Sequence, residues 1–178
     1  MYRMHAVPSP VPQPDSDAPR PDPARAVVDV SRRCGRRGHA IAYDLLRDPG
    51  DAEDAVQEAL ARLWVAYPRL RDQDAADAWF YRAVTNWCLK ALRRRRVAWA
   101  VARWWPLRTA APPAAPERGL LDALRRLPPR QQAAVVLHHA HGFSLLEVAR
   151  ALGVTPGTAK THLARGMKRL RDQLGVQA

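Results

Sequence analysis

The segment PLRTAAPPAAPERG, which runs from Pro106 to Gly119, most constrains how this chain can fold. Proline fixes its own φ angle and lacks an amide hydrogen, so prolines this closely spaced cannot continue a helix and they keep a segment extended. The first 23 residues are also rich in Pro, Asp and Ser, a composition typical of disorder. The sequence therefore predicts a disordered tail over residues 1–23, a folded unit over 24–105, a linker over 106–118 and a second folded unit over 119–178.

Both units are expected to be helical. Val, Ile and Thr form no runs of alternating polar and apolar residues, so no strand is predicted and the fold class is all-α, with two small helical domains. In DPGDAEDAVQEALARLWVAY (48–67), apolar residues recur three and four positions apart. We expect Asp51 to cap this helix, with Asp54 in the capping-box position. The buried stripe of the helix is predicted to consist of Ala52, Ala55, Val56, Ala59, Leu60, Leu63, Trp64 and Tyr67.

The charge of the chain favours a polyanionic partner. There are 29 Lys and Arg residues against 17 Asp and Glu, a net charge of +12. Nucleic acid is the first expectation and an anionic membrane surface the second, with a generally basic composition as the alternative. No run of about 18 apolar residues occurs, so no membrane insertion is expected. Cys34 and Cys88 lie far apart and form no CxxC pair, which is typical of core thiols in a reducing cytoplasm.

The C-terminal unit contains a helix-turn-helix pattern. SLLEVARAL begins with Ser144 and has Glu147 three residues later, which predicts a capping box. Gly153 supplies a turn, and Thr155 followed by Pro156 predicts the start of the last helix. Two short capped helices joined in this way are typical of a unit whose second helix enters the major groove of DNA.

The last helix carries cations on its outward face. Leu163, Met167 and Leu170 are expected to be buried, which leaves Lys160, Thr161, His162 and Arg165 to meet base edges. The amide of Thr158 is placed to meet a phosphate, and the later residues Lys168, Arg169 and Arg171 are expected to contact the phosphate backbone. The alternative is an amphipathic helix whose basic face is only solvated.

Three stretches of the sequence together resemble one protein family. They are DPGDAEDAVQEALARLW (48–64), AWFYRAVTNWCLKALRRRR (78–96) and LRRLPPRQQAAVVLHHAHGFSLLEVARALGVTPGTAKTHLARGMKRLR (124–171). In this order, separated by a Pro/Ala-rich segment, they resemble bacterial RNA polymerase sigma factors of the extracytoplasmic-function (ECF) class of the sigma-70 family. The last stretch alone also resembles LuxR-like regulators.

The resemblance implies roles for both units. Residues 24–105 would be sigma region 2, which binds core RNA polymerase and recognises and melts the −10 element, and residues 119–178 would be sigma region 4, which recognises the −35 element. The implied polymerase-binding residues are Asp51, Glu53, Asp54, Gln57 and Glu58. The implied −10 residues are Trp79, Tyr81, Arg82, Asn86, Lys90, Arg93 and Arg94. The implied −35 residues are Thr158, Lys160, Thr161, His162, Arg165, Lys168 and Arg169.

Several alternatives remain open at this stage. Core packing is the alternative for Trp79, and a solvated surface is the alternative for the acidic residues and for the arginines. Thr85, Lys90, Thr161 and His162 differ from the residues more common in the family, so the promoter preference of this chain is expected to differ too. A stand-alone helix-turn-helix regulator and an adaptor that binds no DNA are the two other functions that fit the sequence.

No catalysis is expected from the sequence. It contains no phosphate-binding glycine loop, no nucleophile elbow and no paired carboxylates of a catalytic site, and we expect no cofactor. His138, His139 and His141 have the wrong spacing for zinc and lack a further ligand nearby, so no metal is expected. The expected partners are core RNA polymerase, promoter DNA and, by family analogy, an anti-sigma factor. The expected location is the cytoplasm, on the nucleoid when the chain is part of the holoenzyme.

Overall fold

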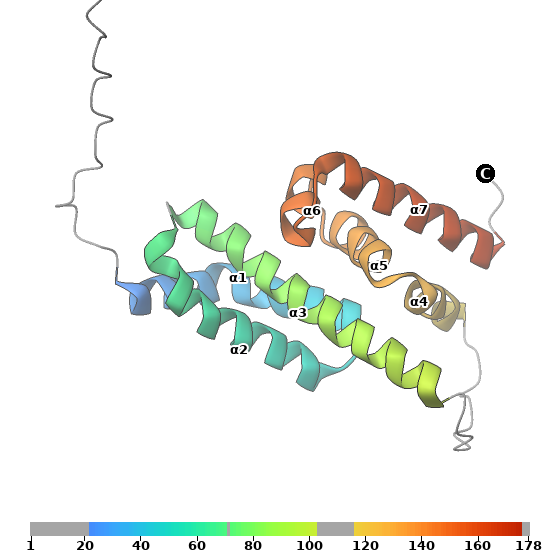
Figure 1. The fold of residues 1–178 in the computed structure, drawn as a ribbon, viewed down its shortest axis with the longest axis horizontal. Coiled ribbons are helices and arrows are strands. Elements are labelled where there is room, and N and C mark those ends of the chain that lie inside the picture. Colours follow the sequence, from blue (N-terminus) through green and yellow to red (C-terminus); the bar gives the residue numbers. More distant parts are fainter. Residues whose placement is uncertain (1–21, 71, 103–115, 176–178) are drawn as a thin grey trace, which may run out of the picture.

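The computed structural model describes residues 22–70, 72–102 and 116–175, and this part of the chain contains helices and turns but no strand (Figure 1). The all-α prediction is therefore confirmed. Most of the expected tail and most of the expected linker lie outside the described residues. The elements, in chain order, are α1 (Pro23–Leu46), α2 (Pro49–Ala66), the 3-10 turn η1 (Tyr67–Arg69), α3 (Gln73–Ala102), α4 (Pro116–Arg126), α5 (Pro129–Val135), the π-helical turn η2 (Val136–Ala140), α6 (Leu145–Leu152) and α7 (Pro156–Leu174).

Helices α1, α2 and α3 pack against one another as the N-terminal unit. Gly38 allows α1 and α3 to approach closely, because a Cβ atom there would lie 2.7 Å from the ring of Phe80. The predicted stripe of α2 is largely confirmed, but Trp64 is 51% exposed and does not belong to the core. Cys34 and Cys88 are both buried free thiols, as expected, and burial raises the pKa of Cys88 to about 12.

The start of α2 differs from the prediction. Asp48, and not Asp51, is the N-cap, and its carboxylate accepts a hydrogen bond from the amide of Asp51 at 2.8 Å. The prediction treated Pro49-Gly50 as a helix breaker. Proline is well suited to the first helical position. Its fixed φ is helical, and an amide hydrogen at that position would have no acceptor within the helix. The helix therefore begins at Pro49, directly after the Asp48 cap, and Asp51 lies inside its first turn.

Helices α4 to α7 form the C-terminal unit. Pro129 begins α5 as predicted, and Gly142, with φ +65°, closes the chain reversal after η2. In η2 the amide of His141 donates to the carbonyl of Val136 at 3.2 Å, a wide turn of the π type. Ala123, Leu127, Val135 and Leu170 form a small cluster that joins α4, α5 and α7.

The two units share one hydrophobic core. Helices α5 and α6 pack directly along α3, and the main buried cluster runs from α1, α2 and α3 through to α5, α6 and α7 (Figure 1). Phe143 and Val148 from the C-terminal unit belong to the same cluster as Phe80 and Val84 of α3. The structure therefore holds the two units in a closed arrangement.

Candidate nucleic-acid and polymerase interfaces

The helix-turn-helix of α6 and α7 is built from the caps that the sequence predicts. Ser144 and Glu147 form a capping box, in which Glu147 accepts from the Ser144 amide at 2.8 Å and the Glu147 amide donates to Ser144 Oγ at 3.3 Å. The Ser144 hydroxyl also donates to the Glu147 carboxylate at 2.7 Å, and this bond together with the one from the Ser144 amide lowers the pKa of Glu147. Gly153 closes α6 with φ +64°, and Thr155 caps α7 by accepting from the Thr158 amide at 3.2 Å. The caps fix where α7 begins and hence which of its residues point outward.

Helix α7 packs through small and apolar residues. Ala159 is fully buried, and a Cβ atom at Gly166 would lie 2.8 Å from Val135 on α5. Of the three residues expected to be buried, Leu170 is buried, whereas Leu163 and Met167 are half-buried against the same clusters. The close approach at Gly166 fixes the rotation of α7 about its own axis.

The predicted −35 residues lie on the outward side of α7. All are exposed except His162, which is half-buried. Thr161 donates its hydroxyl to the carbonyl of Gly157 at 3.0 Å, so that proton is already engaged within the helix. Burial lowers the pKa of His162, and the charges of Arg130 and Arg165 lower it further. His162 is therefore neutral at pH 7 in the free chain. The exposed members of this set are Thr158, Lys160, Thr161, Arg165, Lys168 and Arg169.

The predicted −10 residues divide into two groups along α3. Trp79 is half-buried and packs against the core, which is the alternative that the sequence left open. Tyr81 is also half-buried, and its ring centroid lies 5.2 Å from that of Phe143. Burial raises the pKa of Tyr81, and a hydrogen bond with Cys34 raises it further. The remaining residues are exposed and follow a spacing of three or four along one side of the helix: Arg82, Asn86, Lys90, Arg93 and Arg94.

The acidic side of α2 faces solvent. Glu53, Asp54 and Gln57 are exposed and Glu58 is partly exposed. Gln57 donates to Glu53 at 2.7 Å, and Glu58 pairs with Arg62 at 2.6 Å, each pair one helical turn apart. Carboxylates ordered in this way suit a basic protein surface better than DNA, because the phosphates of DNA would repel them.

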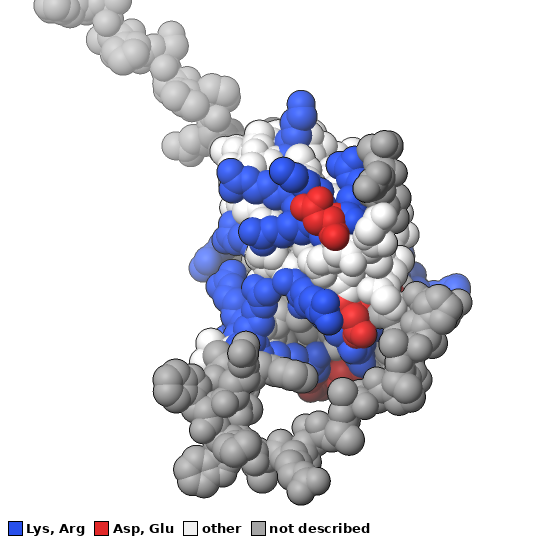
Figure 2. Space-filling view, turned by 90° about the vertical axis from the view of Figure 1, so that its right-hand side faces the viewer, with Lys and Arg blue, Asp and Glu red and all other residues white. Residues whose placement is uncertain are grey.

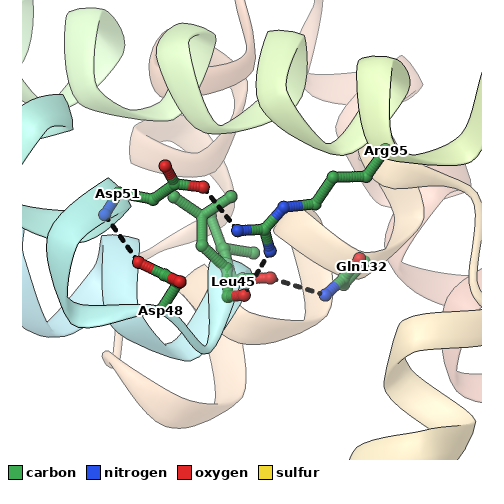
Figure 3. Close-up of polar contacts among 6 residues, drawn as sticks. Leu45, Asp48, Asp51, Arg95 and Gln132 are labelled. Carbon is green, nitrogen blue, oxygen red and sulfur yellow. Dashed lines mark hydrogen bonds and ion pairs between the residues drawn. The ribbon is translucent and has the colours of Figure 1, made fainter. Parts of the chain in front are cut away.

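Asp51 has a different environment from the other acidic residues of α2. Its carboxylate pairs with Arg95 of α3, and Arg95 also donates to the carbonyl of Leu46 at 2.5 Å (Figure 3). The pair ties the start of α2 to the second half of α3. Asp51 is therefore engaged inside the N-terminal unit, and its role in polymerase binding stays a prediction.

Comparison with known proteins identifies the family. Residues 31–97 match Sigma-70 region 2, and residues 117–170 match Sigma-70, region 4. The chain is 35% identical over 136 residues to the RNA polymerase sigma-E factor of Streptomyces coelicolor, covering 75% of this chain and 77% of that protein. It is 34% identical over 152 residues to the ECF RNA polymerase sigma factor SigM of Mycobacterium tuberculosis, covering 84% and 78%. This chain belongs to the ECF class of the sigma-70 family.

A solved structure supports the fold. The sigma factor RpoE of Bartonella quintana, in complex with the anti-sigma factor NepR, matches with a TM-score of 0.61 at 24% identity, covering 87% of this chain and 98% of that one. As a sigma factor, the chain directs RNA polymerase in transcription initiation, and a stand-alone regulator is not favoured. Sigma-70 factors are non-catalytic initiation factors.

In this sigma factor, polar and aromatic contacts join the two units. Arg37 of α1 donates to the carbonyl of His141, and its guanidinium lies 4.3 Å from the ring centroid of Phe143. His141 Nε2 lies 3.0 Å from a carboxylate oxygen of Asp44. The buried Gln132 donates to the carbonyl of Leu45 at 3.2 Å (Figure 3). These residues belong to no predicted site, and no local pattern in the sequence could have paired them, because their partners lie about 90 to 100 positions away.

The closed arrangement also places part of the predicted −10 set beside the helix-turn-helix. A Cβ atom at Gly153 would lie 3.1 Å from Arg82 Nη2, so this guanidinium lies against the turn before α7. A cleft of about 430 Å³ opens next to this contact, and Tyr81, Phe143, Arg37 and Arg150 are among the residues that line it.

Two histidines of the C-terminal unit, His138 and His141, are engaged in polar contacts within the protein. His138 Nδ1 lies 2.7 Å from the carbonyl oxygen of Phe143, and His141 pairs with Asp44. Across residues 22–70, 72–102 and 116–175, no group of three or more His, Cys, Asp or Glu residues could hold a metal ion. In the same part of the chain no helix is both long enough and apolar enough to cross a membrane.

Proposed function

We propose that the two units of this sigma factor divide promoter recognition between them. The unit over residues 24–105 binds core RNA polymerase through α2 and meets the −10 element through α3. The unit over 119–178 reads the −35 element through α7, and residues 106–118 connect the two. The observation that carries this proposal is the helix-turn-helix whose second helix presents exposed cations, on the same chain as an exposed acidic helix.

On α7, the first three turns meet base edges and the later turns meet phosphates. Lys160 and Arg165 can donate to guanine O6 and N7, and Thr161 can offer its methyl group or its oxygen to a base. At the exposed start of α7 the amide of Gly157 suits a phosphate oxygen, whereas the amide of Thr158 already donates to the Thr155 cap. Lys168 and Arg169 lie one to two turns further along and fix the orientation on the backbone without choosing a sequence.

On the N-terminal unit, α2 and α3 serve different partners. Asp54, Gln57 and Glu58 present acceptors to a basic surface of the polymerase. Arg82, Asn86, Lys90, Arg93 and Arg94 form a polar and basic track for the separated strand, and Tyr81 offers an aromatic face to an unstacked base. Tyr81 and Arg82 of this track contact the C-terminal unit in the closed arrangement.

Binding both promoter elements requires the two units to separate. The −10 and −35 positions are about 25 base pairs apart, which is about 85 Å along B-DNA. In the closed arrangement α3 and α6 are in direct contact, and the rings of Tyr81 and Phe143 are 5.2 Å apart. We therefore infer that the closed arrangement belongs to the free chain and that core polymerase holds the units apart.

The chain performs no chemistry of its own in this proposal, because the polymerase supplies the active site and its metal ions. By analogy with the Bartonella sigma factor, we expect an anti-sigma factor that masks one or both units. In the holoenzyme the chain would lie on the nucleoid.

The test is reconstitution with core polymerase on a library of promoter sequences. The proposal predicts run-off transcripts that depend on the added chain and on both promoter elements. Absence of any transcript, together with failure to co-purify with core polymerase, would refute it. Tight and sequence-specific binding of one operator by the free chain would favour a stand-alone regulator instead.

A further inference from the structure

Six exposed arginines come from the second half of α3 and from the C-terminal unit. They come from both units and from four helices. We call this set the basic band, and it consists of Arg93, Arg94 and Arg96 on α3, Arg126 on α4, Arg130 on α5 and Arg169 on α7.

One hydrogen bond and one charge effect link members of the band across the helices. Arg96 of α3 donates to the carbonyl of Arg126 at 3.0 Å, which joins the end of α4 to α3. Pro128 separates Arg126 from Arg130, and the charge of Arg130 is close enough to α7 to lower the pKa of His162. The band therefore leads from α3, across the junction of α4 and α5, to the side of α7 that carries His162.

Among residues 22–70, 72–102 and 116–175, carboxylates neutralise several arginines outside the band. Arg33, Arg62 and Arg95 each pair with an acidic residue. Within the described residues, no member of the band forms an ion pair with a carboxylate, although Arg125 next to it pairs with Asp122 at 3.6 Å. Figure 2 faces the end of the molecule where α3 and α7 finish, and it shows Lys and Arg side chains gathered there with few acidic ones among them.

Such a band matches the phosphates of nucleic acid. Arginine presents a planar fork of donors that fits phosphate oxygens, and duplex DNA offers one negative charge per about 1.7 Å of helix axis. The band leads onto α7, so a duplex that meets the outward face of α7 can continue over the band. This continuity favours duplex DNA over an anionic membrane surface.

We propose that the basic band is a sequence-independent binding surface for duplex DNA, formed by the two units only while they are closed. It lets the free sigma factor bind DNA without polymerase. The proposal rests on the proposed function in one respect, that α7 faces DNA. It differs from that function because Arg96, Arg126 and Arg130 have no part in reading the promoter elements.

The test is a titration of a labelled 30-base-pair duplex of scrambled sequence with the free, full-length chain, followed by fluorescence anisotropy over a range of NaCl concentrations. We expect the triple variant Arg96→Gln, Arg126→Gln and Arg130→Gln to bind at least about 10-fold more weakly, and the slope of log affinity against log salt to become shallower by about 2 to 3. The matched control is Arg32→Gln, Arg36→Gln and Arg62→Gln, which removes the same charge from α1 and α2 and should stay close to the unmodified chain.

A second variant tests the need for closure. Arg37→Ala with His141→Ala removes contacts between the units and leaves every arginine of the band in place. It should bind the scrambled duplex several-fold more weakly than the unmodified chain. Unchanged binding would overturn the requirement for closure. Thermal unfolding followed by circular dichroism verifies that each variant is folded.

Other outcomes overturn the proposal as a whole. These are equal losses in the band and control variants, no binding of the scrambled duplex at low salt, or binding of phosphatidylglycerol vesicles in place of the duplex. Run-off transcription separates this proposal from the proposed function. If the band variant still supports promoter-dependent transcription while it loses the scrambled duplex, both stand. If the unmodified chain binds the duplex but never supports transcription, only the proposed function fails.

Discussion

The acidic side of α2 and the basic band are two charged surfaces of one small protein, and they are built in different ways. The acidic side comes from a single helix, whose residues are ordered by contacts one turn apart, such as Gln57 with Glu53. The band comes from four helices of both units, and it exists only because these units pack together. A surface carried by one helix survives separation of the units, whereas a surface shared between units does not. This difference suits a polymerase contact that must persist and a DNA contact that must change.

The strongest test of this contrast is charge reversal on α2. Asp54→Lys with Glu58→Lys should weaken binding to core polymerase by about 100-fold, because like charges placed across an interface cost several kcal/mol. Competition against the unmodified chain for core polymerase measures the loss. The matched control is the double variant Asp122→Lys on α4 and Asp172→Lys on α7. It should leave polymerase binding near normal. Normal polymerase binding by the α2 variant would show that its acidic side is only solvated.

The next test removes cations from the first half of α7. Lys160→Ala and Arg165→Ala should each lower transcription from promoters that depend on the −35 element by about 10-fold, because one good contact to a base contributes about 1–3 kcal/mol. Run-off transcription with reconstituted holoenzyme measures the effect, and Arg36→Ala on α1 is the control. Binding to core polymerase should not change. If it falls, the division of labour between the two units is wrong.

A third test separates Asp51 from its acidic neighbours. Asp51→Asn should reduce the free energy of unfolding by about 1 kcal/mol, since the partly buried Arg95 loses a charged partner. Urea denaturation measures this change. Arg95→Gln should have a similar effect, and the double variant should be little worse than either single one. Asp54→Asn is the control and should leave stability unchanged. Equal stability of the Asp51 and Asp54 variants would place Asp51 with the solvent-facing residues.

The smallest expected effect concerns pH and His162. Its pKa is lowered, so the ring is neutral at pH 7 and takes up a proton only as the pH falls below its usual value of about 6.5. Protonation adds a charge that favours DNA, so the affinity of holoenzyme for a −35-dependent promoter should rise a few-fold between pH 7.5 and pH 5.5. His162→Gln should remove this rise.

The same shift predicts the opposite trend for stability. A histidine whose folded pKa is lowered binds fewer protons when folded than when unfolded, so it contributes a small loss of stability as the pH falls. Thermal unfolding of the free chain should therefore move slightly downward over the same pH range in which promoter affinity rises. A parallel change in both quantities that His162→Gln abolishes would contradict the lowered pKa of His162 in the folded chain.

Short-range features of the fold could be predicted from the sequence. The capping box of Ser144 and Glu147 and the cap at Thr155 depend on residues three positions apart, and both are confirmed. The exposed cations of α7 follow from its helical periodicity and the fixed start of the helix. The error at Asp51 arose because Pro49 is compatible both with a break and with the first turn of a helix.

Long-range features could not be predicted in this way. The approach of Gly38 to Phe80 depends on the relative placement of two helices, and the bond from Gln132 to Leu45 depends on the placement of two units. Tyr81 shows the limit most clearly, because an aromatic residue on α3 can meet a base or a neighbouring ring, and only the packing of Phe143 decides which it meets here. Trp64 illustrates the reverse case, since its position in an apolar stripe suggests burial and it is half exposed.

The hydrophobic core shared by the two units also affects how tightly polymerase can bind. If polymerase accepts only the open chain, its apparent dissociation constant is the intrinsic value divided by the fraction of open molecules. Every contact across the shared core, including the buried Gln132 and the stacked Arg37 and Phe143, lowers that fraction. Substitutions that loosen this interface would then raise the apparent affinity for polymerase without changing the proposed polymerase-binding residues, and the internal packing of the free chain would set the concentration at which this sigma factor competes for the enzyme.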